Sequence, residues 1–139
     1  MRTKLFVLLL GLCSILFSCT KSDAELNSMI VGTWMPVKVE LFEGKTLVDS
    51  KAAEEDDYDE GEAWRFTANG HFYMGKDIHL PYSISNGKLT CLAMEANITR
   101  LTNTEMVWEI KDPYYIYDGV SEYYGHTIDK YIFYFIRVR

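Results

Sequence analysis

The sequence predicts an all-β fold: an up-and-down antiparallel meander of eight or nine strands, closed into a barrel and preceded by a signal peptide and one short helix. From Thr33 onward, apolar and polar residues alternate with a period of two, as where single charged residues separate Val37, Val39 and Leu41. Turn signals such as Asn-Gly separate these runs, and no helical crossover pattern interrupts them. A meander of this length avoids open edges by closing on itself.

The first residues have the pattern of an export signal. Arg2 and Lys4 give a positively charged start, and residues 5–17 form an apolar core. This core is shorter than the roughly 20 apolar residues that cross a bilayer. Its end, Leu16-Phe17-Ser18-Cys19, resembles a bacterial lipobox, which implies cleavage before Cys19 and a diacylglycerol on that cysteine. The alternative is an ordinary secretory signal that contains Cys19 by chance.

Lipidation of Cys19 would determine where the protein resides. Several acyl chains, palmitate among them, anchor a protein effectively permanently. Residues 1–18 are then the lipoprotein signal peptide, 19–25 the lipid anchor and tether, and 26–139 a single barrel domain. Thr20 stands where lipoproteins retained in an inner membrane often carry aspartate. The expected location is therefore the bacterial cell envelope, as an outer membrane lipoprotein that faces the periplasm or the cell surface.

Charge and cysteine content exclude two further possibilities. The net charge of the chain is −6, and loss of the signal removes two positive charges, so the mature protein repels phosphate backbones and nucleic acid is not an expected partner. With Cys19 acylated, Cys91 has no intrachain partner, so no disulfide is expected. Stability must then come from packing, with Cys91 as a small buried apolar residue.

The expected elements follow one another along the chain. Ser22 and Glu25 form an S-x-x-E capping box, which predicts a short helix that Gly32 stops. Strands are expected near 33–42, 45–49, 62–68, 71–74, 78–85, 88–94, 97–101, 105–111 and 127–138. Pro36 predicts a bulge or a sheet edge early in the first strand. The turns are expected at Glu43-Gly44, Asn69-Gly70, Met74-Gly75, Asn86-Gly87 and Thr102-Asn103.

Several short motifs together resemble a known family. They are Gly32-Thr33-Trp34, Phe66-Thr67-Ala68-Asn69-Gly70 with Phe72, Tyr82-Ser83-Ile84 before Asn86-Gly87-Lys88-Leu89-Thr90, and Tyr134-Phe135-Ile136-Arg137-Val138. The pattern resembles the lipocalin-like domains of bacterial envelope lipoproteins and covers nearly the whole mature chain. The resemblance implies a lipocalin-like barrel in which Trp34 plugs the closed end and Arg137, or alternatively Arg139, stacks across its indole.

The interior and one rim of the barrel supply the candidate ligand-binding residues. Trp64, Phe66, Tyr82 and Trp108 are expected to face inward, and an eight-stranded barrel either fills itself with side chains or holds one small ligand. A tyrosine-rich insertion at 112–126 adds rings that suit stacking on sugars, aromatic ligands or a protein: Tyr114, Tyr115, Tyr117, Tyr123 and Tyr124. The alternative is that these tyrosines cover apolar surface or form an extra hairpin.

The sequence offers no catalytic or metal-binding pattern. His71, His79 and His126 form no H-x-x-x-H spacing, and no G-x-S-x-G motif is present. Asp77 and His79 fall on one strand face, but a zinc site needs at least a third ligand. The acidic run 54–60 lacks the order of an EF-hand loop, so a solvated loop is favoured over a calcium site. We therefore expect no catalytic residue, no cofactor and no metal.

These features predict a membrane-anchored, non-enzymatic binding lipoprotein. It is expected to take a small apolar or aromatic molecule, or a glycan, at the mouth of the barrel. The alternative is a protein-interaction or structural module of an envelope complex that uses the tyrosine-rich segment as its contact face.

Overall fold

The computed structural model describes residues 21–52, 63–92, 94–111, 122–123 and 126–138, and for residues 122, 123 and 126 it describes the backbone alone. The expected signal peptide, Cys19, the acidic run 54–60 and Arg139 lie outside the described residues. So do Tyr114, Tyr115, Tyr117 and Tyr124.

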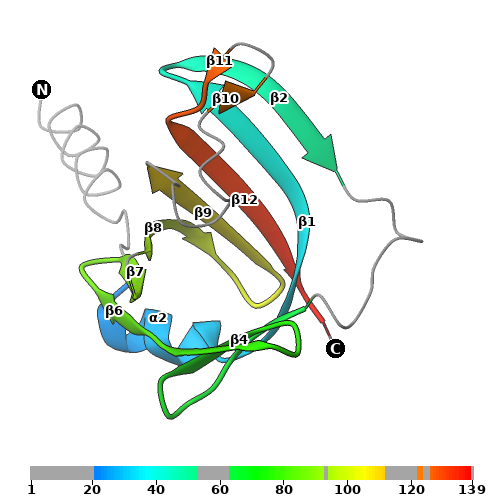
Figure 1. Ribbon diagram of the computed structural model, residues 1–139. Helices are drawn as coiled ribbons and strands as arrows, with labels where there is room; N and C mark the ends of the chain where they lie inside the picture. The colour runs from blue at the N-terminus through cyan, green and yellow to red at the C-terminus, as the bar shows by residue number, and fades with distance from the viewer. Residues whose placement is uncertain (1–20, 53–62, 93, 112–121, 124–125, 139) are drawn as a thin grey trace, which may run out of the picture.

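The described chain consists of one helix followed by strands (Figure 1). The helix is α2 (Asp23–Ile30). The strands are β1 (Gly32–Glu43), β2 (Thr46–Ala52), β3 (Trp64–Phe66), β4 (His71–Met74), β5 (Ile78–Pro81), β6 (Ser83–Ser85), β7 (Lys88–Cys91), β8 (Met94–Leu101), β9 (Glu105–Lys111), β10 (Glu122–Tyr123), β11 (His126–Thr127) and β12 (Lys130–Arg137). Within the described ranges, no helix is long and apolar enough to span a membrane.

The strands form a nearly closed antiparallel barrel, which confirms the predicted fold class. Ten of them make one sheet in the order β5-β4-β3-β1-β12-β9-β8-β7-β6, with β2 paired to β1 beside this path. Neighbours along the path are mostly neighbours along the chain, as in a meander. The last strand, β12, closes onto the first along Trp34–Phe42. The small β10–β11 hairpin pairs separately.

The two ends of the sheet meet at Tyr82. The stretch 78–85, expected as one strand, is divided there: β5 pairs with β4, and β6 pairs with β7. The Tyr82 amide turns instead to the Gly70 carbonyl oxygen at 2.9 Å. One bent stretch of chain therefore joins both edges of the sheet, so the barrel wall continues without a long open edge.

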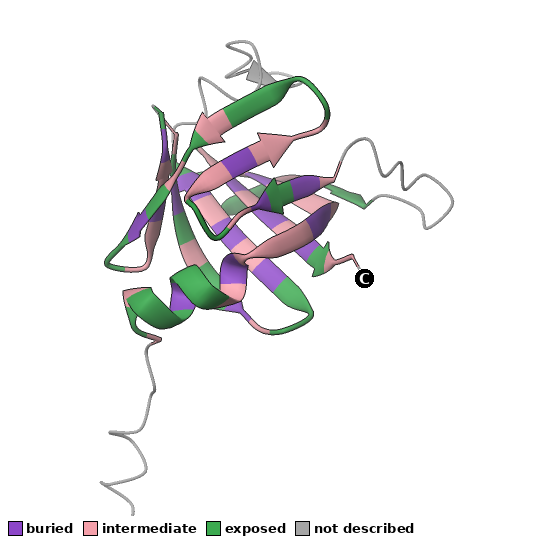
Figure 2. Ribbon diagram, turned by 90° about the horizontal axis from the view of Figure 1, so that it is seen from below, coloured by how far each residue is buried: buried purple, intermediate pink, exposed green. Residues whose placement is uncertain are grey.

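Alternation and the helix together make the core. On β12, Tyr131, Phe133 and Phe135 are buried while the residues between them are more exposed, and Figure 2 shows this alternation along the strands. The helix α2 lies against β6 and β8 and covers one end of the barrel with Leu26 and Ile30, which are both buried (Figures 1 and 2).

Side-chain caps hold the helix in place. The Ser22 hydroxyl accepts a hydrogen bond from the Glu25 amide at 3.2 Å, as the capping pattern predicts. The carboxylate of Asp23 accepts from the amides of Asn86 and Gly87 at 2.9 and 3.1 Å. These two residues form the expected Asn-Gly turn, both with positive φ. The first turn of α2 and the β6–β7 turn therefore hold each other.

Most turns and the bulge lie where they are expected, but the turn between β7 and β8 lies earlier in the chain. The register of β1 against β12 shifts between Pro36 and Lys38, so the predicted bulge is present. The boundary expected after residue 94 lies earlier, because Cys91 pairs with Met94 and the chain turns at Leu92. Leu92 has φ 52° and 70% exposure, although leucine is not a turn-forming residue.

Candidate functional site

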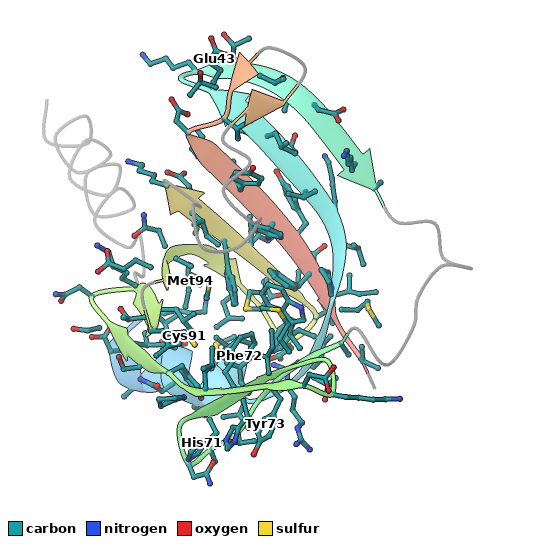
Figure 3. All side chains as sticks on the ribbon, in the orientation of Figure 1. Glu43, His71, Phe72, Tyr73, Cys91 and Met94 are labelled. Carbon is teal, nitrogen blue, oxygen red and sulfur yellow. The ribbon has the colours of Figure 1, made fainter. Side chains whose placement is uncertain are left out.

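The structure brings Trp64, Phe66, Tyr82 and Trp108 together inside the barrel. The first, second and fourth are buried, and Tyr82 is half-buried. Ring centres lie 5.3 Å apart for Trp64 and Trp108, and 5.8 Å apart for Phe66 and Trp108. Phe72, which points inward in Figure 3, stacks on Phe66 at 4.8 Å. We call these five residues the aromatic cluster; its rings pack against one another and against Phe133 and Phe135.

Trp108 has an unsatisfied polar atom at the centre of this packing. Its side chain is fully buried, and its indole Nε1–H has no hydrogen-bond partner in the part of the chain that the structure describes. A buried donor without a partner costs about 1–3 kcal/mol. Trp34, by contrast, donates its Nε1–H to the Ile30 carbonyl oxygen at 2.8 Å. Among the described residues, the indole Nε1–H of Trp108 is therefore a buried donor without an acceptor.

The wall of the barrel has a lateral hollow beside this cluster. On one side of β1, β3 pairs with Gly32–Trp34 and β2 pairs with Lys38–Glu43, so the described strands leave 35–37 unpaired there. A hollow of ≈ 290 Å³ opens at this place, lined by Pro36, Val37, Lys38, Val39, Lys51, Ala52 and Phe133. Phe133 is the inner wall, and it pairs directly with Trp108 across β12 and β9.

Charged and phenolic groups stand beside the lateral hollow. The Lys38 ammonium lies 3.6 Å from the Glu40 carboxylate and 4.9 Å from the centre of the Tyr134 ring. The Tyr134 hydroxyl donates a hydrogen bond to Glu40. This bond, followed by burial and the negative charge of Glu40, raises the pKa of Tyr134 to about 12. Lys38 is therefore held in place beside the hollow by Glu40 and the Tyr134 ring.

The closed end of the barrel contains the stacked pair that the family resemblance implied. The Arg137 guanidinium lies 4.3 Å from the centre of the Trp34 ring. Its Nε, Nη1 and Nη2 donate to the carbonyl oxygens of Asn103, Val31 and Met29 at 2.8, 2.8 and 2.5 Å. Two of these carbonyls belong to the end of α2, which lacks intrahelical partners. Both side chains are fully engaged within the fold.

The tyrosine candidates divide into described and undescribed residues. Tyr82 contacts Phe66 edge-on at 5.1 Å and donates its hydroxyl to the Thr67 carbonyl oxygen at 3.0 Å. Burial raises the pKa of Tyr82. The backbone of Tyr123 pairs with His126 in the β10–β11 hairpin. The remaining tyrosines of the insertion lie outside the described residues, so the predicted rim stays a prediction.

A second hollow, of ≈ 590 Å³, lies where α2 meets the barrel. It is lined by Lys21, Ser22, Asp23, Leu26, Asn86, Gly87, Ile98, Thr99, Arg100, Leu101 and Thr102. Two of its three charged groups have structural partners: Asp23 binds the β6–β7 turn, and Arg100 lies 2.7 Å from the Glu105 carboxylate. We therefore interpret this hollow as a junction between elements.

Sequence reasoning missed a pair of histidines. The Nε2 of His79 and the Nδ1 of His71 lie 2.8 Å apart, although the two residues were judged separately from the sequence. The β4–β5 hairpin places His79 opposite Tyr73, with His71 two residues away on the same face. The sequence predicted strands at 71–74 and 78–85 on either side of the turn at Met74-Gly75. Pairing the end of the first strand with the start of the second would have placed His71 and His79 on one face.

The remaining candidate groups are structural. Cys91 is buried, and burial raises its pKa, so its thiol is a poor nucleophile. In the part of the chain that is described, no group of three or more His, Cys, Asp or Glu side chains is placed to hold a metal ion. Comparison of the chain with protein-family models, curated proteins and solved structures finds no match.

Proposed function

We propose that the chain is a non-enzymatic binding lipoprotein of the bacterial envelope, anchored to a membrane through Cys19. Its ligand is a small apolar or aromatic molecule that carries a hydrogen-bond acceptor. The ligand enters at the lateral hollow and reaches toward Trp108. The observation that carries the proposal is the buried, unpartnered Nε1–H of Trp108.

Three features support this route. The hollow is mainly apolar, as small-molecule sites are, with Pro36, Val37, Val39, Ala52 and Phe133 in its wall. Its inner wall, Phe133, is the cross-strand neighbour of Trp108. An acceptor on the ligand would satisfy a donor that otherwise costs free energy.

A fluorescence titration tests the binding site. The probe is 8-anilinonaphthalene-1-sulfonate, added to the full chain in detergent. Val37→Trp places a large ring in the hollow and should abolish saturable binding. Val107→Trp is the matched control, because Val107 is a half-buried strand valine outside the hollow. Trp108→Phe should weaken binding about five- to tenfold through loss of one hydrogen bond.

Equal affinity in the parent, Val37→Trp and Trp108→Phe would refute the site. In that case, a stoichiometric protein partner recovered from the host envelope would favour the alternative of an interaction module. Metabolic labelling tests the anchor: palmitate should be incorporated into the parent and into Cys13→Ser, which changes the cysteine inside the apolar core 5–17, but not into Cys19→Ser.

A further inference from the structure

The outer face of the β3–β4–β5 region contains a cluster that the proposed binding function does not use. His71, Tyr73 and His79 belong to the β4–β5 hairpin, and Figure 3 shows His71 and Tyr73 on the side of the ribbon opposite Phe72. His79 is exposed and His71 is half-buried. The cluster is therefore accessible from solvent and separate from the lateral hollow.

The two imidazoles are close enough to share one ion. The distance from Nε2 of His79 to Nδ1 of His71 is 2.8 Å. In the metal-free state one nitrogen donates its proton to the other. If each ring keeps its single proton on its other nitrogen, both facing nitrogens present lone pairs, and no net proton is gained or lost.

The separation of the nitrogens selects a type of geometry. With metal–nitrogen bonds of about 2.0 Å, two nitrogens 2.8 Å apart subtend about 90° at the metal. A tetrahedral zinc site would require the nitrogens to lie about 3.3 Å apart. Adjacent positions at 90° belong to the tetragonal arrangement that Cu(II) and Ni(II) prefer with nitrogen ligands, and Cu(II) binds more tightly in the Irving–Williams order.

Neighbouring residues hold both histidines in position. The backbone of His71 is fixed by Thr67, whose amide and hydroxyl donate to the His71 carbonyl oxygen at 2.9 and 3.1 Å. The His79 ring stacks on Tyr73 with ring centres 4.5 Å apart and planes 5° apart. The Arg65 guanidinium carbon lies 4.5 Å from the centre of the Tyr73 ring. The stacking fixes the plane of the His79 ring, so less conformational freedom is lost when the ring binds a ligand.

We propose that His71 and His79 form a surface site for Cu(II), with water in the remaining coordination positions. Water is required because the described side chains offer no third histidine, cysteine, aspartate or glutamate at this place. The site is a two-imidazole clamp set by the register of one hairpin.

Copper titration of the full chain in detergent tests the proposal, with Cu(II) alone as the probe. The parent should bind one Cu(II) whose electron paramagnetic resonance spectrum shows coupling to two nitrogens. His71→Gln and His79→Gln should each remove the two-nitrogen pattern and weaken the affinity by more than about 10-fold, because each removes a ligand and not only an outer-shell partner. His126→Gln, which removes the third histidine, should leave both unchanged.

Thermal unfolding of each metal-free variant separates binding from folding. His79→Gln should unfold at the temperature of the parent, because His79 is exposed. Two results would overturn the site: Cu(II) affinity that is the same in parent and His79→Gln, or loss of binding in His126→Gln alone.

Discussion

Replacing Arg137 with lysine tests whether the closed end of the barrel depends on the shape of one guanidinium. Arg137 joins three segments: it stacks on Trp34 in β1 and donates to carbonyl oxygens at the end of α2 and in the β8–β9 turn. Lysine keeps the positive charge, but it presents one ammonium group in place of a planar fork. The substitution therefore isolates geometry from charge.

The expected loss follows from these contacts. An ammonium at this position can replace one of the three hydrogen bonds, so two are lost at about 1 kcal/mol each. The cation–π contact with the fully buried Trp34 weakens by about 0.5–1 kcal/mol. The total is about 2.5 kcal/mol, which corresponds to a fall in Tm of about 10 °C for a domain of this size.

Urea and thermal unfolding, followed by circular dichroism, measure this loss. The matched control is Arg100→Lys, because the Arg100 side chain is 61% exposed and makes a surface ion pair with Glu105. Such a pair contributes about 0–1 kcal/mol, so the control should change stability little. If Arg137→Lys cost no more than Arg100→Lys, the closed end would not depend on the fork, and Arg137 would be a surface residue in energetic terms.

Three further predictions each test a single feature of the fold. Gly32→Ala should destabilise the fold by about 3 kcal/mol, since Gly32 has φ 142° and a Cβ there would lie 2.3 Å from Nη1 of Arg137. If the losses from Gly32→Ala and Arg137→Lys added fully in the double variant, the clash with Arg137 would not be the cause. Leu92→Asn should raise the free energy of unfolding by about 1 kcal/mol, because asparagine tolerates φ 52° better and the leucine is exposed; unchanged or lower stability in urea would refute this. Tyr134 has its pKa raised to about 12 in the fold against about 10 unfolded, so its stabilisation is present below pH 10 and lost as the pH rises through 12. Absorbance at 295 nm should therefore show a tyrosine that titrates near pH 12. Tyr134→Phe should remove this step and Glu40→Gln should shift it to lower pH, and an absorbance change near pH 12 that is the same in the parent and in both variants would refute the assignment.

Local chemistry made most of the barrel predictable. The Asn-Gly turns, the capping serine and the strict alternation of β12 each act within a few residues, so the sequence shows them directly. Boundaries were wrong where tertiary contacts override local preference. The chain turns at Leu92 because Cys91 pairs with Met94. The expected strand 78–85 is divided at Tyr82 because the residues before it pair with β4 and the residues after it pair with β7.

The candidate site was less predictable because it depends on contacts distant in sequence. Alternation placed Trp64, Phe66 and Trp108 inside, but only the packed rings show how they fill space. The lateral hollow arises from the point where two partner strands of β1 diverge, which no local pattern encodes. The His71–His79 contact depends on the register of one hairpin.

Pro36 links the bulge in β1 to the lateral hollow. The Thr33 carbonyl oxygen accepts from the Val138 amide, so Thr33 faces β12 and, by alternation, Pro36 faces the opposite side, where 35–37 lack a partner strand among those described. Proline has no amide hydrogen, so this side carries one fewer unpaired donor. A residue other than proline would leave an unpaired amide there, with which a strand of another chain could pair, as happens at exposed sheet edges. The proline therefore disfavours pairing of another strand at this part of β1, and so helps to keep the wall open beside Phe133.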